Sequence, residues 1–594
     1  MLTTIRQALY LMGREQRRRW VLLLLLAVVT SLLEIVSATL VYLLVALVAN
    51  SDGAVSLPLI GDIRSYAGGL DRTTLLLVLC GFMLGFFLIR AGVSITAEYV
   101  MARMTENAAA RLSRRLVAGY LAMPYPFHLN RHSSELIRNS HQATLDIATA
   151  VFSPLIRAAS ETILALGLLA LLLTVSPIGA VLAILVVGGA SALLLAVIQP
   201  RLKRYSITTW ALDKETLGSL QQSYEGVRDI KLLGREGSFA RTYGHARSRL
   251  ARMLYTRTAL LTVPRLILET SLIWFIIVFF MIALATGSDA RAALSTLGLF
   301  AYAGLRLQPS LTRVVYGFTS VKFSGALTAA LRDDLRTIEE QPSEQEPVRP
   351  LPFETELQLE HVSFSYEGRT AEAVADVDLV IRRGEQIGIC GSTGGGKTTL
   401  VDLITGLLPA TSGRVLADGA DIAEDLRGWQ RNIGMVSQVV FLTDDTLRRN
   451  IALGVDDDDV DEAVVAEAVK VARLEELVAS LPDGLDTVVG ERGARISGGE
   501  RQRIAIARAL YHRPQVLIFD EGTSALDNLT EQSLMRSLRE LRGSHTILLV
   551  AHRLSTVREA DRVVFMQDGR VAGVGTFQEL FERCDAFRRM AEAG

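Results

Sequence analysis

Six long apolar stretches fill the first part of this 594-residue chain, and they restrict that part to helices that cross a membrane. A helix needs about 20 mainly apolar residues to cross the hydrocarbon core of a bilayer. The first stretch is much longer than the apolar segment of a cleavable signal peptide, so we expect it to be retained as a span. The sixth stretch is interrupted by polar residues. The predicted spans are 20–49, 74–97, 151–175, 178–198, 259–286 and 292–320.

Basic residues flank these stretches on alternate sides. By the positive-inside rule, connections rich in arginine and lysine lie in the cytosol. We therefore predict a multi-pass protein of the inner (plasma) membrane, with both termini and the soluble part cytoplasmic. The basic residues assigned to the cytosolic side are Arg14, Arg17, Arg18, Arg19, Arg103, Arg111, Arg114, Arg115, Arg201, Lys203 and Arg204, whereas the opposite side carries Arg64, Arg72 and Arg291.

The two internal cytosolic connections, 98–150 and 199–258, are too long to be simple turns. Each has the pattern of an amphipathic helix with one break. The first break is predicted at Met123-Pro124-Tyr125-Pro126, because proline ends helices, and the second near 224–237. Arms of about 26 residues would carry the membrane helices roughly 39 Å into the cytosol. We therefore expect a short transverse element at each break, where it can touch a soluble domain.

A stretch rich in Glu, Gln, Ser and Pro, 337–353, separates the membrane part from a soluble part. This composition is typical of a linker, so we predict a transmembrane domain over 1–336 and a soluble α/β domain over 354–594. The formal net charge of −1 gives no indication of nucleic-acid binding. The three cysteines lie far apart in the sequence and lack the spacing of a disulfide framework or a metal site.

The soluble part contains a phosphate-binding loop between a short apolar strand and a predicted helix start. Its residues fill the G-x-x-x-x-G-K-[ST] spacing. Glycines let backbone N–H groups wrap a triphosphate, the lysine reaches the β- and γ-phosphates, and the threonine hydroxyl can bind Mg²⁺. The helix N-terminus adds a favourable field for phosphate. The predicted ATP-binding residues of this loop are Gly391, Ser392, Thr393, Gly394, Gly395, Gly396, Lys397, Thr398 and Thr399.

Two further apolar strands end in residues that suit nucleotide hydrolysis. Val516–Phe519 is wholly apolar, as is typical of a strand buried in a parallel sheet, and Asp520 and Glu521 follow it. Because nucleotides bind at the carboxyl ends of such strands, we predict that Asp520 holds Mg²⁺ and that Glu521 orients or deprotonates the attacking water. The strand 546–550 leads to His552, for which we predict a contact to the γ-phosphate.

A second candidate phosphate site is a Ser-Gly-Gly turn at the start of another helix. Ser497, Gly498, Gly499 and Glu500 precede an arginine-rich helical segment. One γ-phosphate needs only one phosphate-binding loop within a chain. The simplest use of the second phosphate site is therefore to close over a nucleotide held by another copy of the chain. Tyr366, which follows an alternating strand, is available to stack on a purine.

Together these motifs resemble the nucleotide-binding domain of an ATP-binding cassette (ABC) protein. The resemblance makes Mg²⁺ ligands of Thr398, Gln438 and Asp520. Glu500 stands where glutamine is commonest and Gly522 where alanine is usual, and neither change removes a phosphate donor. In the family's terms, the adenine-stacking residue is Tyr366, the Walker A motif is Gly391–Thr398, and the Q-loop holds Gln438. The signature is Ser497–Glu500, and Walker B and the catalytic glutamate are Asp520 and Glu521. The D-loop is Ser524–Asp527, with Asp527 at the nucleotide, and the switch histidine is His552.

The membrane half resembles the exporter type of the same family, so the resemblance covers nearly the whole chain. It implies coupling helices near 123–133 and 224–231, and a second half-transporter chain as partner. The intact catalytic motifs favour a homodimer over a heterodimer. Among exporters, the segments Thr262–Glu269 and Leu305–Ser310 resemble those of lipid-linked oligosaccharide flippases, which would make Asn50–Asp71 a short external helix.

Three arginines, Arg90, Arg265 and Arg306, lie inside apolar stretches, where a charge is costly and usually faces a polar cavity or a partner. Counting from the outer span ends places them at depths of roughly 24, 31 and 21 Å, in the cytosolic half of the membrane. An anionic headgroup entering from the inner leaflet would meet them there, and guanidinium groups suit phosphate oxygens. The alternatives are snorkelling to the interface and neutralisation by carboxylates, with Glu34, Glu161 and Glu269 as the candidates.

The resemblance therefore implies an ATP-hydrolysing transporter that alternates between inward-open and outward-open states as a dimer. The predicted substrate is a lipid-linked oligosaccharide or a similar amphiphile taken from the inner leaflet. The alternatives are an exporter of another lipid, a peptide or a drug, and an importer built on the exporter architecture. An ATP-gated regulatory or channel-like protein is disfavoured because Glu521, Gln438 and His552 are all present.

Overall fold

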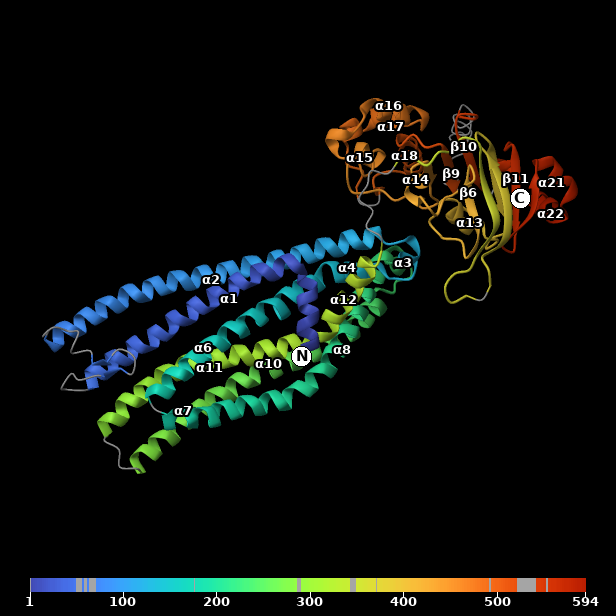
Figure 1. The fold of residues 1–594 in the computed structure, drawn as a ribbon. Coiled ribbons are helices and arrows are strands. Elements are labelled where there is room, and N and C mark those ends of the chain that lie inside the picture. The colour runs from blue at the N-terminus through green and yellow to red at the C-terminus, as the bar shows by residue number, and fades with distance from the viewer. Residues whose placement is uncertain are drawn as a thin grey trace. The chain divides into compact units, whose positions relative to one another are not determined.

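The computed structural model describes residues 2–49, 56–57, 61–62, 71–175, 177–285, 290–341, 349–369, 371–490, 493–520, 541–551 and 554–593. The chain folds into two compact units, one built of helices and the other of strands and helices (Figure 1). The first unit contains Met1–Met123 and Phe127–Ser343, and the second contains Glu344–Gly594 together with Pro124–Pro126.

Long helices occupy all six predicted membrane stretches. Within the described residues, five helices are long and apolar enough to cross a bilayer, and a sixth candidate is α11 joined to α12 through a bend of 52°. α11 is continuous through the predicted sixth span, and the bend follows its end at Phe323. The helices are α1 (Leu2–Ala49), α2 (Arg72–Ala122), α6 (Ser153–Val175), α7 (Pro177–Ala183), the π-helical segment η3 (Ile184–Gly188), α8 (Gly189–Glu225), α10 (Glu236–Ala285), α11 (Ala290–Phe323) and α12 (Gly325–Glu339).

Both predicted breaks in the cytosolic connections are present. Met123 takes an extended conformation (φ −67°, ψ 146°), because the ring of Pro124 disfavours helical geometry in the residue before it. Gly226 ends α8 (φ −90°, ψ 15°). The segments after the breaks are α3 (Tyr125–Leu129), α4 (Ser133–Ser140), α5 (Gln142–Ile147) and the π-helical segment η2 (Ala148–Phe152) in the first connection, and α9 (Val227–Leu232) in the second.

The described part of the first external connection contains strands. Ser56–Leu57 (β1) pairs antiparallel with Gly61–Asp62 (β2). The expectation of a short external helix is therefore wrong for these residues. Glycine is a poor helix former, so Gly61 is consistent with a strand here.

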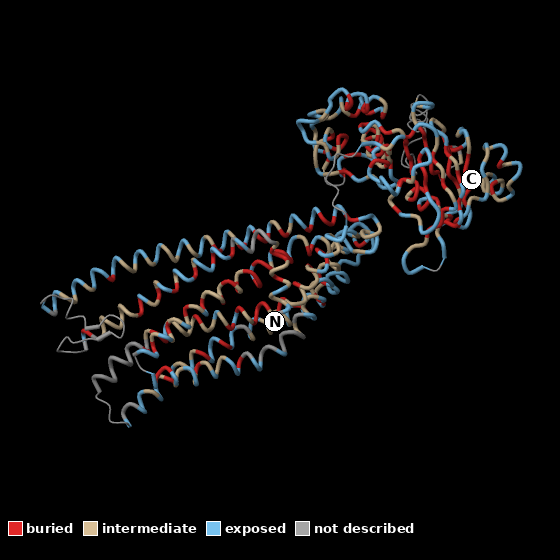
Figure 2. The backbone as a smooth tube through the Cα atoms, viewed as in Figure 1, coloured by how far each residue is buried: buried red, intermediate tan, exposed pale blue. Residues whose placement is uncertain are grey.

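Large apolar side chains on the outside of the helical unit fit a lipid environment. On α2, Leu77, Leu84 and Leu88 are 69%, 71% and 74% exposed, and Figure 2 shows exposed positions along most of this helix. In contrast, Leu164, Leu168 and Leu172 of α6 are buried inside the bundle. In a bilayer, the exposed leucines contact acyl chains as apolar as themselves, so their exposure costs little.

The second unit is built around a six-stranded sheet with the strand order β12-β11-β5-β10-β9-β8. The strands from β11 to β8 run parallel, and β12 is antiparallel to β11. A smaller antiparallel sheet has the order β4-β3-β6-β7. The strands are β3 (Glu356–Phe364), β4 (Val374–Arg382), β5 (Gln386–Gly391), β6 (Ser412–Ala417), β7 (Ala420–Asp421), β8 (Ile433–Val436), β9 (Val516–Asp520), β10 (Thr546–Val550), β11 (Arg562–Gln567) and β12 (Arg570–Gly575).

Helices and the smaller sheet cover both faces of the parallel sheet. Along β9, Leu517 and Phe519 join one apolar core, whereas Val516 and Ile518 join the other. Burial on both faces explains why the strand is apolar at successive positions. The helices are α13 (Lys397–Ile404), α14 (Leu426–Gln430), α15 (Leu447–Ile451), α16 (Glu462–Val471), α17 (Glu475–Ser480), α18 (Gly498–Tyr511), α20 (Leu554–Val557), α21 (Phe577–Arg583) and α22 (Asp585–Ala593).

Candidate functional site

The predicted phosphate-binding loop joins β5 to α13. Gly396 at the start of α13 has φ +93°, a left-handed conformation that glycine adopts without strain. A Cβ atom at this position would lie 2.5 Å from the carbonyl oxygen of Ala373, and one at Gly391 would lie 2.0 Å from that of Met566. The loop therefore packs against neighbouring backbone too closely for any side chain at these two positions.

We expect Gly396→Ala to weaken ATP binding about tenfold or more, because both the left-handed conformation and the contact with Ala373 force the loop to move. The matched control is Gly419→Ala, which has a similar φ of +82° but no neighbouring atom within 4 Å of the new Cβ. Titration with a fluorescent ATP analogue measures the affinity, and thermal unfolding checks that both variants fold. Equal affinities in the two variants would contradict the proposed role of the loop.

Side chains around the loop hold it in shape. The Lys397 ammonium is buried and donates hydrogen bonds to the carbonyl oxygens of Gly391 (3.0 Å) and Ser392 (2.9 Å). The hydroxyls of Tyr366 and Thr399 lie 3.1 Å apart, so the tyrosine predicted to stack on adenine is tied to α13. Thr398 is exposed in the first turn of α13. The structure thus brings Tyr366 and the loop residues together.

The carboxyl ends of three parallel strands meet beside this loop. Val550 of β10 pairs with Ile389 of β5 on one side and with Asp520 of β9 on the other. Asp520 is buried at the end of β9. Gln438 follows the neighbouring strand β8 and is exposed. Glu521, Gly522, Ser524, Asp527 and His552 lie outside the described residues, so their predicted roles remain predictions.

Asp402 is a site residue that the sequence interpretation missed. It lies on α13, and burial, with a smaller contribution from the charge of Asp520, raises its pKa to about 6. The single acidic residue on the helix that follows the phosphate-binding loop was the available signal in the sequence.

The Ser-Gly-Gly turn begins α18, as predicted. The Ser497 hydroxyl accepts a hydrogen bond from the backbone N–H of Glu500, and the Glu500 carboxylate accepts one from the N–H of Ser497. The pKa of Glu500 is lowered. Partial burial acts to raise it, but the hydrogen bonds from Ser497 together have the larger effect. Glutamate and glutamine serve equally in such a capping box, so the unusual Glu500 leaves the helix start intact.

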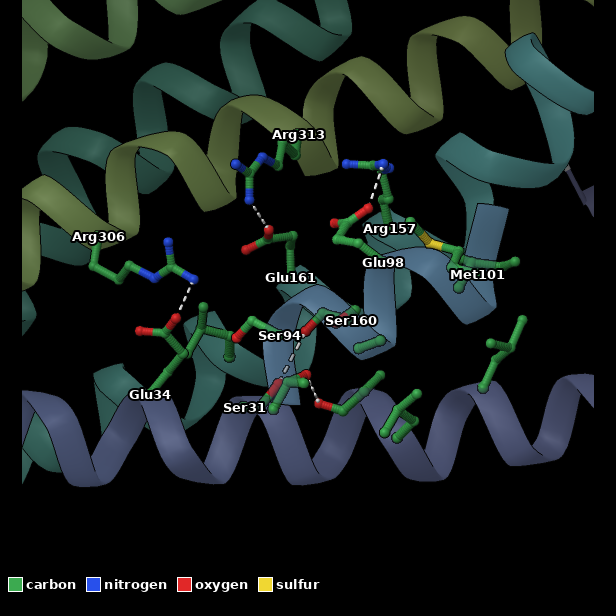
Figure 3. Close-up of a pocket in the computed structure, with 17 residues that line it drawn as sticks. Ser31, Glu34, Ser94, Glu98, Met101, Arg157, Ser160, Glu161, Arg306 and Arg313 are labelled. Atoms are coloured by element: carbon green, nitrogen blue, oxygen red, sulfur yellow. Dashed lines mark hydrogen bonds and ion pairs between the residues drawn. The ribbon is translucent and has the colours of Figure 1, made fainter. Parts of the chain in front are cut away.

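The transmembrane helices enclose a polar cavity of about 130 Å³, here called the Glu34 pocket. Its walls come from α1, α2, α6 and α11, and Figure 3 shows three ion pairs around it. The buried Glu34 carboxylate lies 2.5 Å from Nη2 of Arg306 and also pairs with Arg90. The residues that line it are Leu23, Leu26, Ala27, Thr30, Ser31, Glu34, Ser94, Ala97, Glu98, Met101, Ile156, Arg157, Ser160, Glu161, Leu164, Arg306 and Arg313.

Two further carboxylates in the Glu34 pocket are paired. Glu161 is buried, pairs with Arg313 and accepts a hydrogen bond from the Ser310 hydroxyl at 2.6 Å. Glu98 pairs with Arg157 at 2.7 Å. The sequence indicated Glu161 as a group that neutralises a membrane arginine, but its partner Arg313 was not predicted.

The three predicted cavity arginines are not all in one place. Arg90 and Arg306 meet at Glu34, and of these only Arg306 lines the pocket. Arg265 instead pairs with Glu269 at 3.0 Å, one turn away on α10, as the alternative interpretation had it. Glu269 also accepts a hydrogen bond from Gln308 of α11 at 3.3 Å.

Comparison with known proteins identifies both halves of the chain. The model of the ABC transporter transmembrane region matches residues 20–302, and the model of the ABC transporter nucleotide-binding part, described as ABC transporter, matches residues 374–524. An ATP-dependent lipid A-core flippase of Chromobacterium violaceum is 32% identical over 528 residues, which cover 86% of each chain. The chain belongs to the ABC transporter family.

Two further comparisons agree with this assignment. An ATP-dependent lipid A-core flippase of Francisella tularensis is 29% identical to the transporter over 90% of this chain and 89% of the relative. The solved structure of a bacterial Atm1-family ABC exporter with ATP bound is 24% identical, covers 98% of each chain and has a TM-score of 0.80, so the two share a fold. The predictions of the family, of the fold class and of an ATP-hydrolysing transporter are therefore confirmed. One transmembrane region and one nucleotide-binding domain per chain make it an exporter half-transporter.

Proposed function

We propose that the transporter is a homodimeric flippase that moves an anionic amphiphile, of the lipid-diphosphate class, out of the inner leaflet. The observation that carries this proposal is the Glu34 pocket, a cluster of charged side chains within apolar helices. Ionisable groups in such a place are costly and are usually kept for function. The proposal places the protein in the inner membrane, with both termini in the cytoplasm.

The charge balance of the pocket favours an anionic ligand. The charged lining residues balance, three arginines against three glutamates, and Arg90, which pairs with Glu34 from outside the lining, gives the cluster an excess of one positive charge. Within the described part of the chain, the buried Nε of Arg306 and Oε2 of Glu34 have no hydrogen-bond partner. A phosphate group could accept a hydrogen bond from Arg306 and compete with Glu34 for it. The arginines are Arg90, Arg157, Arg306 and Arg313, and the glutamates are Glu34, Glu98 and Glu161.

A second cavity supports an amphiphilic substrate. It measures about 290 Å³ and lies between α6, η3, α10 and α11. Its walls are apolar except for Thr162 and Gln308, and they include the rings of Phe275 and Phe300. A hydrocarbon chain fits such a lining, since it forms no hydrogen bonds. The relatives named as lipid A-core flippases also favour a lipid, and a lipid-linked oligosaccharide would likewise combine a hydrocarbon chain with phosphate groups.

The nucleotide chemistry of the proposal uses two chains. ATP would be held by one chain and covered by the signature turn of the other, with α3 and α9 as the coupling helices. Glu521 would orient the attacking water and His552 would contact the γ-phosphate. The proposed ATP ligands are Tyr366, Gly391–Thr399, Gln438, Ser497–Glu500, Asp520 and Asp527, with Thr398, Gln438 and Asp520 as the Mg²⁺ ligands.

The test removes the charges of Arg90 and Arg306 without leaving the Glu34 carboxylate buried and unpaired. Replacing only the arginines would strand a buried carboxylate, which costs about 3–5 kcal/mol, so the variant combines Glu34→Gln, Arg90→Gln and Arg306→Gln. In proteoliposomes we expect flipping of a fluorescent lipid diphosphate to fall about tenfold or more, with basal ATP hydrolysis largely retained.

The matched control is Arg103→Gln, an exposed arginine of α2 that does not line the pocket. It should flip the lipid at the wild-type rate. Undiminished flipping in the Glu34 variant would remove the pocket from substrate recognition. Faster transport of a neutral drug than of the lipid by the wild type would favour a drug exporter instead.

A further inference from the structure

A separate polar cavity of about 380 Å³ lies in the cytosolic extensions of the first unit, here called the Trp210 pocket. Its walls come from α4, α5 and η2 of the first cytosolic connection, from α8 and α10 of the second, and from the junction of α11 and α12. Trp210 lies 16 residues beyond Leu194, the last residue of the apolar span in that segment. At 1.5 Å per residue this is roughly 24 Å along the helix, well outside the hydrocarbon core.

Arg138 of α4 is buried in the wall of this pocket and is only 3% exposed. Its guanidinium lies 3.5 Å from the centre of the Trp210 ring. Its Nη atoms donate to the Trp210 carbonyl oxygen (3.4 Å) and to Oδ1 of Asn139 (3.2 Å). Within the described residues, its buried Nε has no hydrogen-bond partner. A buried N–H donor without an acceptor is costly, so an oxygen atom beside this group would be favourable.

Arg257 of α10 repeats this arrangement across the pocket. Its guanidinium lies 4.6 Å from the centre of the Phe323 ring. Its Nε is also buried without a hydrogen-bond partner among the described atoms. Both arginines thus stack on aromatic rings and line the same cavity, and the Nε of each is buried without a partner among the described atoms. Stacking orients a guanidinium group and leaves the N–H groups at its edge available to donate hydrogen bonds to an oxyanion.

The charges in the pocket wall favour an anion over a cation. Arg138, Arg247 and Arg257 face two carboxylates, an excess of one positive charge. Of the carboxylates, Asp213 lies 3.9 Å from Arg138, and Asp146 accepts a hydrogen bond from Gln142 at 3.2 Å. Asp213 thus shares the charge of Arg138, and the charges of Arg257 and Arg138 also act on Asp146, so an oxyanion would compete with these carboxylates for the arginines. The cavity is also far larger than the about 30 Å³ that one water molecule occupies, so it has room for a molecular ligand.

We propose that the Trp210 pocket binds an oxyanion, the phosphate group of a soluble molecule or of a lipid headgroup, between Arg138 and Arg257. The site is distinct from the Glu34 pocket and does not depend on the proposed flippase function. Because its walls come from both cytosolic connections, a bound anion would bridge α4 to α8 and α10. Occupancy would therefore restrain the separation of these helices.

Trp210 itself reports on the pocket. The full chain is placed in nanodiscs of phosphatidylcholine, and its nucleotide sites are saturated with a non-hydrolysable ATP analogue and Mg²⁺. Inorganic phosphate is then titrated in while tryptophan emission is recorded. We expect a saturable change that disappears in Trp210→Phe. Arg257→Gln should weaken the apparent affinity about tenfold or more, since a hydrogen bond to a charged group is lost. The control Arg252→Gln, an exposed arginine of α10 outside the pocket, should bind like the wild type.

A parallel titration with phosphatidic acid in the nanodiscs separates the two sources of the phosphate. A response to inorganic phosphate indicates a soluble ligand, and a response to phosphatidic acid alone indicates a lipid headgroup. The proposal is overturned if neither phosphate source changes the emission, if the change persists in Trp210→Phe, or if Arg257→Gln and Arg252→Gln bind with equal affinity. Arg257 is the better test position, because Arg138 is buried and its replacement could prevent folding.

Discussion

Glu521→Gln is expected to bind Mg-ATP with unchanged affinity but to hydrolyse it at least about 100-fold more slowly, as the loss of a general base implies. Glu521 directly follows Asp520, which ends a strand buried on both faces. Glutamine keeps the size of the side chain and removes its basicity, so binding and hydrolysis should separate. Binding is measured with a fluorescent ATP analogue, and hydrolysis by release of inorganic phosphate.

Lys397→Ala is the contrasting variant for this experiment. The Lys397 ammonium lies within the loop and bonds to two of its carbonyl oxygens, so its loss should weaken nucleotide binding itself. Turnover at the wild-type rate in Glu521→Gln would remove Glu521 from the role of general base. Weak binding in both variants would indicate that Glu521 supports the nucleotide site instead of the chemistry.

Local sequence patterns predicted the elements of this fold because each pattern has a local physical cause. Six apolar stretches became long helices, since a bilayer leaves few other ways to satisfy backbone hydrogen bonds. Pro124 ended a helix through its own ring. The apolar strand before Asp520 lies in the interior of a parallel sheet, where both faces are covered. Ser56–Leu57 pairs with Gly61–Asp62 as strands, and the helix that the family resemblance implied for this segment is absent from these residues.

Side-chain partners across helices could not be predicted in the same way. Arg306 and Glu34 are separated by 272 positions, and their pairing depends on how α1 and α11 pack. The apolar pattern of a helix gives its buried face but does not give the residue that it meets. For this reason Glu34 and Glu161 could be named only as candidates, and Arg313 was missed. The Trp210 pocket, which joins residues of both cytosolic connections, was missed for the same reason.

An intact nucleotide site should reappear when two differently defective chains are paired. If each site combines the Walker A loop of one chain with the signature turn of the other, Lys397→Ala chains alone and Ser497→Arg chains alone should both be inactive. A mixed dimer of the two, isolated through a different tag on each chain, contains one site with both defects and one site with neither. Such a dimer should recover up to about half of the wild-type ATPase activity, because a two-fold symmetric dimer has two equal sites.

The matched control places the same two substitutions on one chain and pairs that chain with the wild type. Each of its sites then carries one defect, so no intact site remains although the mixture of side chains is identical. Recovery in the first pair and its absence in the second can arise only from sites shared between two copies of this chain. Activity in the second pair and its absence in the first would place each nucleotide site within one chain, because only the second pair contains a chain without defects. Inactivity of the unmodified pure chain would instead indicate that a different half-transporter supplies the partner site.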